Sequence, residues 1–355
     1  MRKIWFVAVI LAILLFSGCQ PESKNEITEF PVLKTIGFKE ISVPDILAIP
    51  GEIIVQNEKV IVLDLETDWF FKVFSMESFD FLGSIIRKGR GPEEEVMISP
   101  YFRAYGDDAF LFQGAGTVKI GKVRTSQDGL AFDLTEKYEL PVEMYDDTDF
   151  FLINGKLCSS ISYQPLVKDF RGFCLETGEL FQWGEMLPLN KPVSDPGVPF
   201  VLEKLTTIKP DGQRLATVYG KLPTVRIYYA EDGRLLSEMQ VTDSSKNKEI
   251  LLDNSSDYIR DGLINYYFRI KSTNDYIYAL YQGQPVVEFS LEGGVPKYQD
   301  VASELHIWDW NGNPIMNLKF ERSVFSFDVT PDNKQIIALS IVDVDKLFVS
   351  EIPWD

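Results

Sequence analysis

The sequence predicts an all-β fold: a six-bladed β-propeller of four-stranded antiparallel blades, with the ring closed by the N-terminal strand beside the C-terminal strand. Amphipathic helical periodicity is hard to find in the body of the chain, where short β-rich runs bounded by turn residues dominate. One pattern, a polar turn followed by an alternating apolar strand, recurs six times. The copies are roughly 50 to 60 residues apart, which is the length of one four-stranded propeller blade.

Each copy of this pattern predicts one blade. The six copies lie at 57–65, 106–113, 154–162, 211–219, 274–281 and 332–340. A second pattern, in which two strands flank a turn, follows the first in most units, at 70–86, 118–134, 170–186, 225–241 and 304–320. Its Asp-Gly and Asn-Gly pairs supply the positive φ angles that tight hairpins require. Because a single repeat period covers the body, we favour one propeller over two β-sandwiches.

The sixth unit lacks a strand. Residues 345–355 provide one strand and then the chain ends, which leaves the last blade with an open edge. Residues 32–43 have strand character but no blade of their own. We therefore predict that this N-terminal segment pairs beside the C-terminal strand and closes the ring.

Three segments interrupt the repeat and are expected to form loops on the rims of the propeller. Residues 185–203 carry four prolines and join blades three and four. Residues 242–262 join blades four and five, and residues 282–303 lie inside blade five. Rim loops commonly carry function, so these segments are candidates for a binding role.

The N-terminus has the features of a secretory signal. A short basic start precedes an apolar run over 4–16, which is shorter than the about 20 residues that a membrane-spanning helix needs. Small residues stand directly before Cys19. This arrangement resembles the bacterial lipoprotein box, which implies cleavage before Cys19 and lipidation of its thiol. The alternative is an ordinary signal peptide with an incidental cysteine.

The chain is therefore expected to have three parts: a signal peptide over 1–18, a flexible lipid-anchored tether over 19–30, and the propeller over 31–355. The expected location is the cell envelope, as an outer-membrane lipoprotein facing the periplasm or the surface, and a lipid on Cys19 is the expected contact with the membrane. The formal net charge of −18 repels phosphate backbones, so no nucleic-acid partner is expected. One His and three Cys exclude histidine-rich zinc sites and a disulfide-dense scaffold.

Three motifs carry a resemblance to a known family. They are GSIIRKGRGPEEE at 83–95, YIYALYQG at 276–283 and IWDWNGNPI at 307–315. Behind a lipoprotein signal, this combination resembles the TolB-like six-bladed propeller lipoproteins of Bacteroidetes-type bacteria, over nearly the whole mature chain. The family's usual segment is Gly-x-Gly-Pro-Gly-Glu, and Glu93 replaces a glycine here. The resemblance implies the fold and an envelope location, and it implies no substrate.

The first of these motifs places three cations, Arg87, Lys88 and Arg90, within four positions of an acidic protein. Two glycines in the same segment free the backbone and could expose amides beside the cations. We interpret the segment as a candidate site for an anion or carboxylate, at the mouth between blades one and two. The alternative is a structural crossover between blades, with an arginine paired to one of the glutamates at 93–95.

Aromatic residues of the fifth unit form a second candidate binding site. Tyr281 belongs to an alternating run of tyrosines, and Trp308 and Trp310 stand just before a hairpin turn. Such a strip could stack on sugars or peptides, although packing between blades is the commoner fate. The lone His306 starts a strand and no nucleophile-elbow motif occurs. We therefore expect a hydrogen-bonded or exposed residue rather than a catalytic base.

Cys158 and Cys174 flank a predicted hairpin and lie opposite each other in a symmetric register. The oxidising envelope permits a disulfide, but directly opposed strand cysteines often meet poor disulfide geometry. The sequence leaves both a disulfide and two buried thiols open, and the thiols are favoured.

No sequence motif defines a metal site. No EF-hand spacing occurs, and the acid clusters at 107–108, 146–149 and 343–345 are interpreted as solvated turn residues. Convergence of carboxylates from several blades in a central tunnel stays open. We expect a non-catalytic envelope lipoprotein, without a cofactor, whose propeller face binds a peptide, a glycan or another envelope protein. The alternative is a metal-dependent hydrolase or lactonase acting in the central tunnel.

Overall fold

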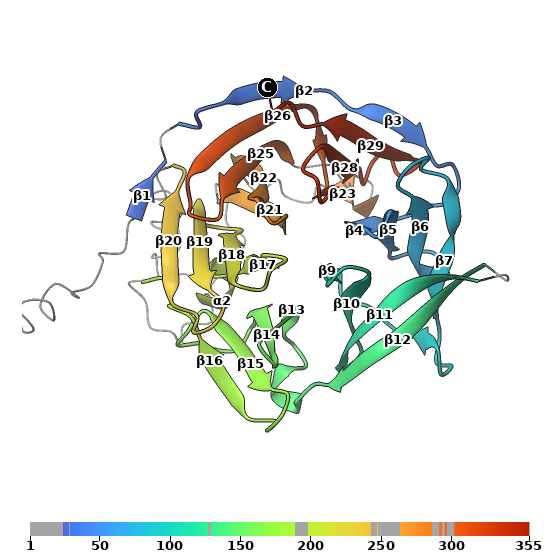
Figure 1. Cartoon of the computed structure of the whole chain (residues 1–355), viewed down its shortest axis with the longest axis horizontal. Helices are drawn as coiled ribbons and strands as arrows, with labels where there is room; N and C mark the ends of the chain where they lie inside the picture. Colours follow the sequence, from blue (N-terminus) through green and yellow to red (C-terminus); the bar gives the residue numbers. More distant parts are fainter. Residues whose placement is uncertain are drawn as a thin grey trace, which may run out of the picture.

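The computed structural model describes residues 24–27, 29–126, 129–188, 198–242, 247, 263–285, 291–292, 295–296 and 302–354. The described strands form six blades around a central opening, each with four antiparallel strands in order from the axis outward (Figure 1). This arrangement confirms the predicted all-β propeller. The described residues include a 3-10 turn, η1 (Val142–Met144), and a short α-helix, α2 (Val198–Val201). None of the described helices is long and apolar enough to cross a membrane.

The blades follow one another along the chain, and blades one to three each begin with the strand nearest the axis. Blade one consists of β4 (Pro50–Gln56), β5 (Lys59–Asp64), β6 (Trp69–Ser75) and β7 (Phe81–Lys88), with the short β8 (Glu94–Glu95) added in parallel to β7. Blade two consists of β9 (Phe102–Tyr105), β10 (Ala109–Gly114), β11 (Thr117–Ser126) and β12 (Gly129–Glu139). Blade three consists of β13 (Thr148–Ile153), β14 (Lys156–Ile161), β15 (Phe170–Cys174) and β16 (Leu180–Trp183).

Blades four and five repeat this plan, and blade six differs in its last strand. Blade four consists of β17 (Lys204–Ile208), β18 (Arg214–Tyr219), β19 (Thr224–Tyr229) and β20 (Leu235–Gln240). Blade five consists of β21 (Ile264–Ser272), β22 (Tyr276–Pro285), β25 (Ala302–Asp309) and β26 (Pro314–Val324). A separate hairpin of β23 (Leu291–Glu292) and β24 (Val295–Pro296) lies between β22 and β25 in the chain. Blade six consists of β27 (Ser326–Val329), β28 (Gln335–Leu339) and β29 (Lys346–Glu351), and its outermost strand comes from the N-terminus.

The six copies of the sequence repeat correspond to the second strand of each blade. The turn before that strand explains the polar residues in the repeat: Asn57 and Glu58 have φ angles of 47° and 58°, and Asn154 and Gly155 have 49° and 71°. Positive φ angles at both central residues define a type I′ turn, whose twist matches that of the two strands it joins in a hairpin. The hairpin between β6 and β7 lacks a turn glycine, and Phe79 takes the left-handed conformation there, with a φ of 59°.

The core lies between the blades. At the contact of blades one and two, the ring of Phe71 meets the rings of Phe102, Phe110 and Phe112 edge to face, with centroid distances of 5.0, 5.1 and 5.6 Å. Each such pair contributes about 0.5–1.5 kcal/mol beyond the area that it buries. Because both faces of a middle strand meet a neighbouring blade, a strand such as β10 is buried along its whole length.

The N-terminal segment closes the ring, as predicted. Strand β3 (Lys39–Ser42) pairs antiparallel with β29, with Glu40 opposite Phe348, and becomes the fourth strand of blade six. The amide of Val43 extends the ladder by donating to the carbonyl of Asp345 at 2.7 Å. The pairing protects the edge of β29, which would otherwise be open to other chains.

Two further strands precede β3, and their pairing was not expected from the sequence. β1 (Lys24–Glu26) pairs in parallel with β20, and β2 (Leu33–Ile36) pairs in parallel with β26. β2 lies inside the segment 32–43, so the part of that segment that pairs beside the C-terminal strand, as predicted, is β3. We call β1, β2 and β3 the N-terminal strap, which follows the outer edges of blades four, five and six (blue in Figure 1). β1 belongs to the segment that the sequence assigns to the tether, so contact with the ring begins before residue 31.

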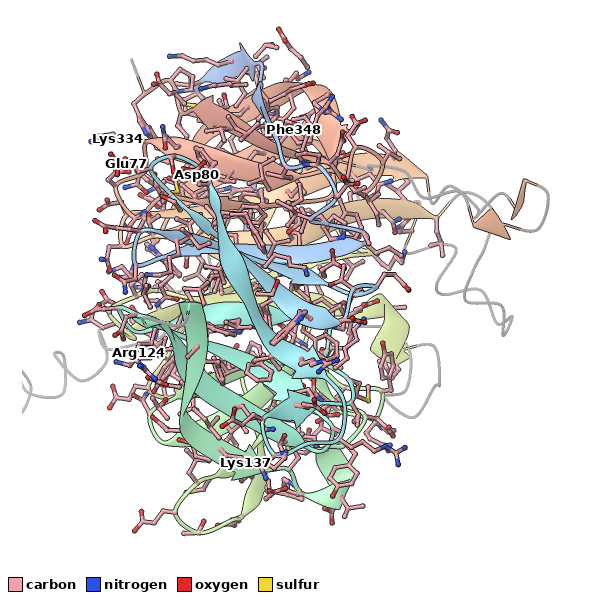
Figure 2. All side chains as sticks on the ribbon, turned by 90° about the vertical axis from the view of Figure 1, so that its right-hand side faces the viewer. Glu77, Asp80, Arg124, Lys137, Lys334 and Phe348 are labelled. Carbon is pink, nitrogen blue, oxygen red and sulfur yellow. The ribbon has the colours of Figure 1, made fainter. Side chains whose placement is uncertain are left out.

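The two faces of the ring differ. We call upper the face at which the innermost strands begin, and lower the opposite face. Because neighbouring strands alternate in direction, the connections from a second to a third strand, and from one blade to the next, leave from the upper face. Figure 2 shows the β23–β24 hairpin on that side, at the right, whereas Glu77, Asp80 and Lys334 lie in lower-face turns at the left.

Candidate functional site

The innermost strands carry buried charged side chains near the propeller axis, where Glu52 on β4 joins three blades. Its carboxylate lies 3.0 Å from Arg269 Nε and 3.1 Å from Lys271 Nζ, both on β21. It also accepts a hydrogen bond of 2.5 Å from the hydroxyl of Ser326 on β27. Burial acts to raise the pKa of Glu52, but Lys271, Arg269 and Ser326 together outweigh it and hold the pKa below its usual value. We call these four residues the Glu52 cluster.

Asp149 on β13 joins the other three blades. One of its carboxylate oxygens pairs with Arg103 on β9, and the other accepts hydrogen bonds from the hydroxyl of Ser160 on β14 and, at 3.0 Å, from the amide of Thr206 on β17. Arg103 also donates to the carbonyl of Thr206 at 2.9 Å. Asp149 has a φ of 54°, a left-handed value that aspartate tolerates better than most residues. We call Asp149, Arg103, Ser160 and Thr206 the Asp149 cluster. It joins the innermost strands of blades two, three and four, and the Glu52 cluster joins those of blades one, five and six.

These contacts bear on the hydrolase that the sequence leaves open as an alternative. Glu52 and Asp149 each already face a cation. A third carboxylate on an innermost strand, Asp328 on β27, accepts backbone hydrogen bonds from Val55 at 2.7 Å and Val329 at 2.8 Å. Among the residues that the structure describes, no three His, Cys, Asp or Glu side chains come together as metal ligands. A metal-dependent hydrolase or lactonase in the central tunnel stays a prediction.

A small cavity opens on the upper face between blades three and four. Its volume is about 20 Å³, which is room for roughly one water-sized group. The end of β14, the loop after it, α2 and the start of β17 form its walls. The polar lining residues are Ser160, Ser162, Gln164, Glu203 and Lys204, and apolar side chains including Leu166, Met186 and Leu202 complete the walls. We call this the blade three–four cavity.

A buried ion-pair network fixes one wall of this cavity. Asp169 is completely buried and accepts hydrogen bonds from Arg226 Nη1 at 2.8 Å and from the hydroxyl of Tyr228 at 2.6 Å. The ammonium group of Lys204 lies 3.9 Å from the same carboxylate, and Arg226 also pairs with Glu238 at 2.8 Å. The charge of Lys204 is therefore compensated inside the protein, although the residue lines the cavity.

The acid cluster at 146–149 differs from its interpretation as solvated turn residues. Asp146 is exposed, but Asp147 is completely buried and Asp149 is 5% exposed. Burial raises the pKa of Asp147 to about 6, although the hydroxyl of Ser162 and the charge of Arg171 act to lower it. The interpretation was wrong for these two residues because the connection into blade three turns inward against blade two: the carbonyl of Asp147 accepts a hydrogen bond of 2.9 Å from Gln113.

Replacement of Asp147 by asparagine is expected to stabilise the protein at pH 7.5 and to leave it unchanged near pH 4. Ionisation of a carboxyl whose pKa is raised on folding costs stability above the folded pKa, here about 6, and costs nothing below the unfolded pKa near 3.8. The full shift corresponds to about 3 kcal/mol. Chemical unfolding at both pH values measures the difference, with D107N at an exposed turn as the control. An equal difference at the two pH values would contradict this account.

The candidate anion site around Arg87, Lys88 and Arg90 lies at the upper end of β7. The amide of Gly89 donates to the carbonyl of Glu95 at 2.9 Å, and the amide of Gly91 donates to the carboxylate of Glu94 at 2.9 Å. Lys88 Nζ donates to the carbonyl of Leu65 at 2.6 Å.

The contacts of that segment resemble a crossover into blade two more than an open anion site. A Cβ on Gly89 would overlap the carboxylate of Glu94, so the first glycine is needed for close approach. Arg87 and Arg90 are exposed and form no ion pair with a described residue, so the pairing expected with the glutamates at 93–95 is not seen among them. Anion binding by the two guanidinium groups stays a prediction.

The aromatic candidates lie together but face inward. Trp308 is completely buried and Trp310 is 4% exposed, with its indole N–H donating to the carbonyl of Thr273 at 3.0 Å. Tyr281 stacks on His306 at a centroid distance of 4.3 Å. His306 is buried too, its Nδ1 lies 3.2 Å from the hydroxyl of Tyr267, and burial lowers its pKa although Glu304 acts to raise it. The strip therefore packs blades four and five against each other.

Cys158 and Cys174 are both free thiols in the structure, Cys158 buried and Cys174 partly exposed. The register pairs Cys158 with Gly172 and Cys174 with Lys156, so the two cysteines are not directly opposed as expected from a symmetric hairpin. The centre of the β14–β15 connection lies nearer the N-terminus than the sequence suggests. The indole N–H of Trp183 donates to the sulfur of Cys158 at 3.2 Å, and burial raises the pKa of that thiol to about 12.

Some predicted features lie outside the described residues. They include Cys19, the signal peptide and most of the residues that interrupt the repeat. Sequence reasoning missed Glu52, Glu203 and the buried role of Asp149. The one signal for these residues is a charge next to a strand start, and that signal is shared by many solvated turn residues.

Comparison with known proteins identifies related folds. The family model described as TolB-like 6-blade propeller-like matches residues 26–332. A solved structure of a DUF4221 family member from Bacteroides vulgatus has a TM-score of 0.54 at 11% identity, covering 90% of this chain and 98% of that chain. A Bacteroides fragilis protein whose name suggests export has a TM-score of 0.54 at 13% identity, covering 93% of this chain and 100% of that chain. Identities this low show similarity of fold alone, and no curated protein matches the chain.

Proposed function

Because the chain belongs to the TolB-like six-bladed propeller family, we propose that it is a non-catalytic binding protein of the cell envelope. In this proposal a lipid on Cys19 anchors the chain to the outer membrane, and the upper face of the propeller binds a peptide, a glycan or another envelope protein. The family supplies a fold and no substrate. The proposal therefore rests on the contrast between the two faces of the ring.

The lengths of the connections differ between the faces, and this is the observation that supports partner binding most directly. On the lower face, tight turns join the strands, such as 57–58 between β4 and β5 and 154–155 between β13 and β14. On the upper face, residues 184–203 and 241–263 separate consecutive strands, and residues 286–301, which include the β23–β24 hairpin, separate β22 from β25. The blade three–four cavity also opens there. Variable loops on one face of a rigid ring are a common way to build a binding surface.

The contacts of the tunnel residues favour a scaffold over a catalyst. A general acid or base needs a titratable group that can reach a substrate. Glu52 and Asp149 are occupied by ion pairs, and His306 is buried among aromatic rings. These groups support the shape of the ring, which in turn holds the upper-face loops in fixed positions.

The envelope location is supported by the N-terminal sequence and by one structural neighbour. The residues before Cys19 resemble a lipoprotein box, and the Bacteroides fragilis protein of similar fold has a name that suggests export. β1, the first strand of the strap, pairs with β20 at the outer edge of blade four, a few residues after Cys19 in the sequence. A chain attached through residue 19 would therefore be held at the rim of the ring, with the upper face left free.

Replacement of Cys19 by alanine is expected to abolish lipidation. Without the thiol no acyl chain can be attached, and a protein with so much negative charge has little affinity of its own for an anionic membrane surface. Metabolic labelling with an alkyne fatty acid, together with membrane fractionation, measures both effects. The matched control is C174A, which removes a partly exposed thiol of the propeller and should keep label and location. Unchanged labelling of C19A would contradict the anchor.

Partner binding is expected to depend on the upper face. Replacing residues 286–301 by Asn-Gly removes the β23–β24 hairpin and leaves β22 and β25 joined by a four-residue turn, because extending their register beyond Tyr281 and Glu304 places residue 283 opposite residue 302. This variant should fold and should lose the partners that the full chain captures from envelope extracts. Charge reversals on the lower face, E77K and K334E, should leave those partners in place. Loss with the lower-face variants and not with the hairpin variant would contradict the proposal.

A further inference from the structure

The blade three–four cavity contains a carboxylate without a cation of its own. Glu203 lines the cavity and forms no ion pair with a residue that the structure describes. The charge of Lys221 acts on it, but the ammonium group of Lys221 donates to the side-chain oxygen of Asn265. Burial raises the pKa of Glu203 above its usual value. A partly buried carboxylate of this kind gains stability when a cation reaches it.

Two neighbouring carboxylates do not share this property. Asp149 pairs with Arg103, and Asp169 pairs with Arg226 and Lys204. Since Lys204 is occupied by Asp169, and its ammonium group also lies 5.3 Å from the ring centroid of Phe170, it is not an open anchor for an anion. Glu203 is therefore the carboxylate on the described lining of the cavity, and no described cation forms an ion pair with it.

The size and lining of the cavity restrict the groups that can meet that charge. A volume of about 20 Å³ has room for one group of the size of a water molecule or an ammonium group. Leu166, Met186 and Leu202 form apolar walls. The hydroxyl oxygen of Ser162 and the side-chain carbonyl oxygen of Gln164 belong to lining residues and are further groups that can accept hydrogen bonds. The carboxylate of Glu203 and the apolar walls together match a cationic head on a short apolar stem.

We propose that the blade three–four cavity binds a primary ammonium group carried on a short apolar stem, with Glu203 as its counter-ion. This inference rests on the proposed upper-face binding and names the chemistry that the face recognises. The ammonium group can be the N-terminus of a peptide or the side chain of a lysine. Both present the same head to Glu203, and they differ in the part of the peptide that carries it.

Three peptides distinguish these sources in ligand-observed NMR titrations of the propeller. The first is Leu-Ala-Ala-amide with a free N-terminus, the second is acetyl-Ala-Lys-Ala-amide, and the third is acetyl-Leu-Ala-Ala-amide, which has no ammonium group. The first or the second should bind, and the third should not. The E203Q variant should weaken that binding about tenfold or more, because a hydrogen bond to a charged group is lost.

Two further variants keep the test sharp. Q164W places a bulky ring at the exposed opening of the cavity, away from the core, and should block the peptide without unfolding the protein. E143Q makes the same change as E203Q at an exposed upper-face glutamate outside the cavity, and should bind like the wild type. Equal binding of the third peptide, absence of binding by all three, or full binding by E203Q would overturn the ammonium site. None of these results changes whether the β23–β24 hairpin is needed to capture partners. The cavity proposal can therefore fail while the proposed upper-face binding holds.

Discussion

Replacement of Glu52 by alanine is expected to lower the free energy of unfolding by about 3–5 kcal/mol, because it leaves two buried cations without their counter-ion. Arg269 and Lys271 have side chains 8% and 12% exposed, and Glu52 is the carboxylate paired with both. The hydroxyl of Ser326 also loses its acceptor. Denaturant unfolding followed by tryptophan fluorescence measures the change.

The pH dependence adds a second signature to this variant. The folded pKa of Glu52 lies below 4.5, so its contribution is present above that pH and is lost as the pH falls through the lower folded value. The difference between wild type and E52A should therefore shrink in acid. E66A, at an exposed turn after β5, is the control and should change stability by no more than about 0.5 kcal/mol. A loss below about 1 kcal/mol for E52A would contradict a tie between blades.

Removal of the ring-closing strand is expected to abolish the fold. A chain that begins at residue 44 lacks β3, so β29 keeps an open edge and Phe348 loses its contact with Phe38, whose ring centroid lies 6.3 Å away. A chain that begins at residue 31 loses β1 and Phe30 but keeps β2 and β3. The longer chain should unfold cooperatively at a lower midpoint than the full chain. Near-ultraviolet circular dichroism and size-exclusion chromatography separate the two cases.

A peptide of residues 31–44 offers a test of the same closure in trans. Added to the chain that begins at residue 44, it should pair with β29 and restore the near-ultraviolet signal. A scrambled peptide of the same composition should not. If the chain from residue 44 folds as a stable monomer without the peptide, β3 does not close the ring in the way that the register indicates.

The sequence predicts the blades well because each blade repeats one local pattern. A polar turn such as Asn154-Gly155 fixes a tight hairpin through its own backbone angles, and the alternating strand follows at once. Ring closure could be predicted because the sixth unit lacks a strand and 32–43 lacks a partner. The parallel addition of β1 and β2 could not, since an added parallel strand has no turn that marks its neighbour.

The candidate sites were harder to predict because they depend on contacts between distant blades. Glu52 and Arg269 meet only once the ring is closed, and neither has a local motif. Trp308 and Tyr281 lie on strands that are covered on both sides by other blades, so alternation does not show which aromatic side chains reach the solvent. Cys158 and Cys174 depend on the register of one hairpin, and a shift of the connection separates them.

The central claim is that the upper face, and not the lower one, binds the partner. Photo-crosslinking in living cells tests it most directly, with a photoreactive residue placed at exposed Gln164 on the upper face or at exposed Glu77 on the lower face (Figure 2). Crosslinks from Gln164 to one dominant partner, reduced by E203Q and absent from Glu77, are the expected result. Crosslinks from Glu77 alone, or the same products from both positions, would contradict the claim.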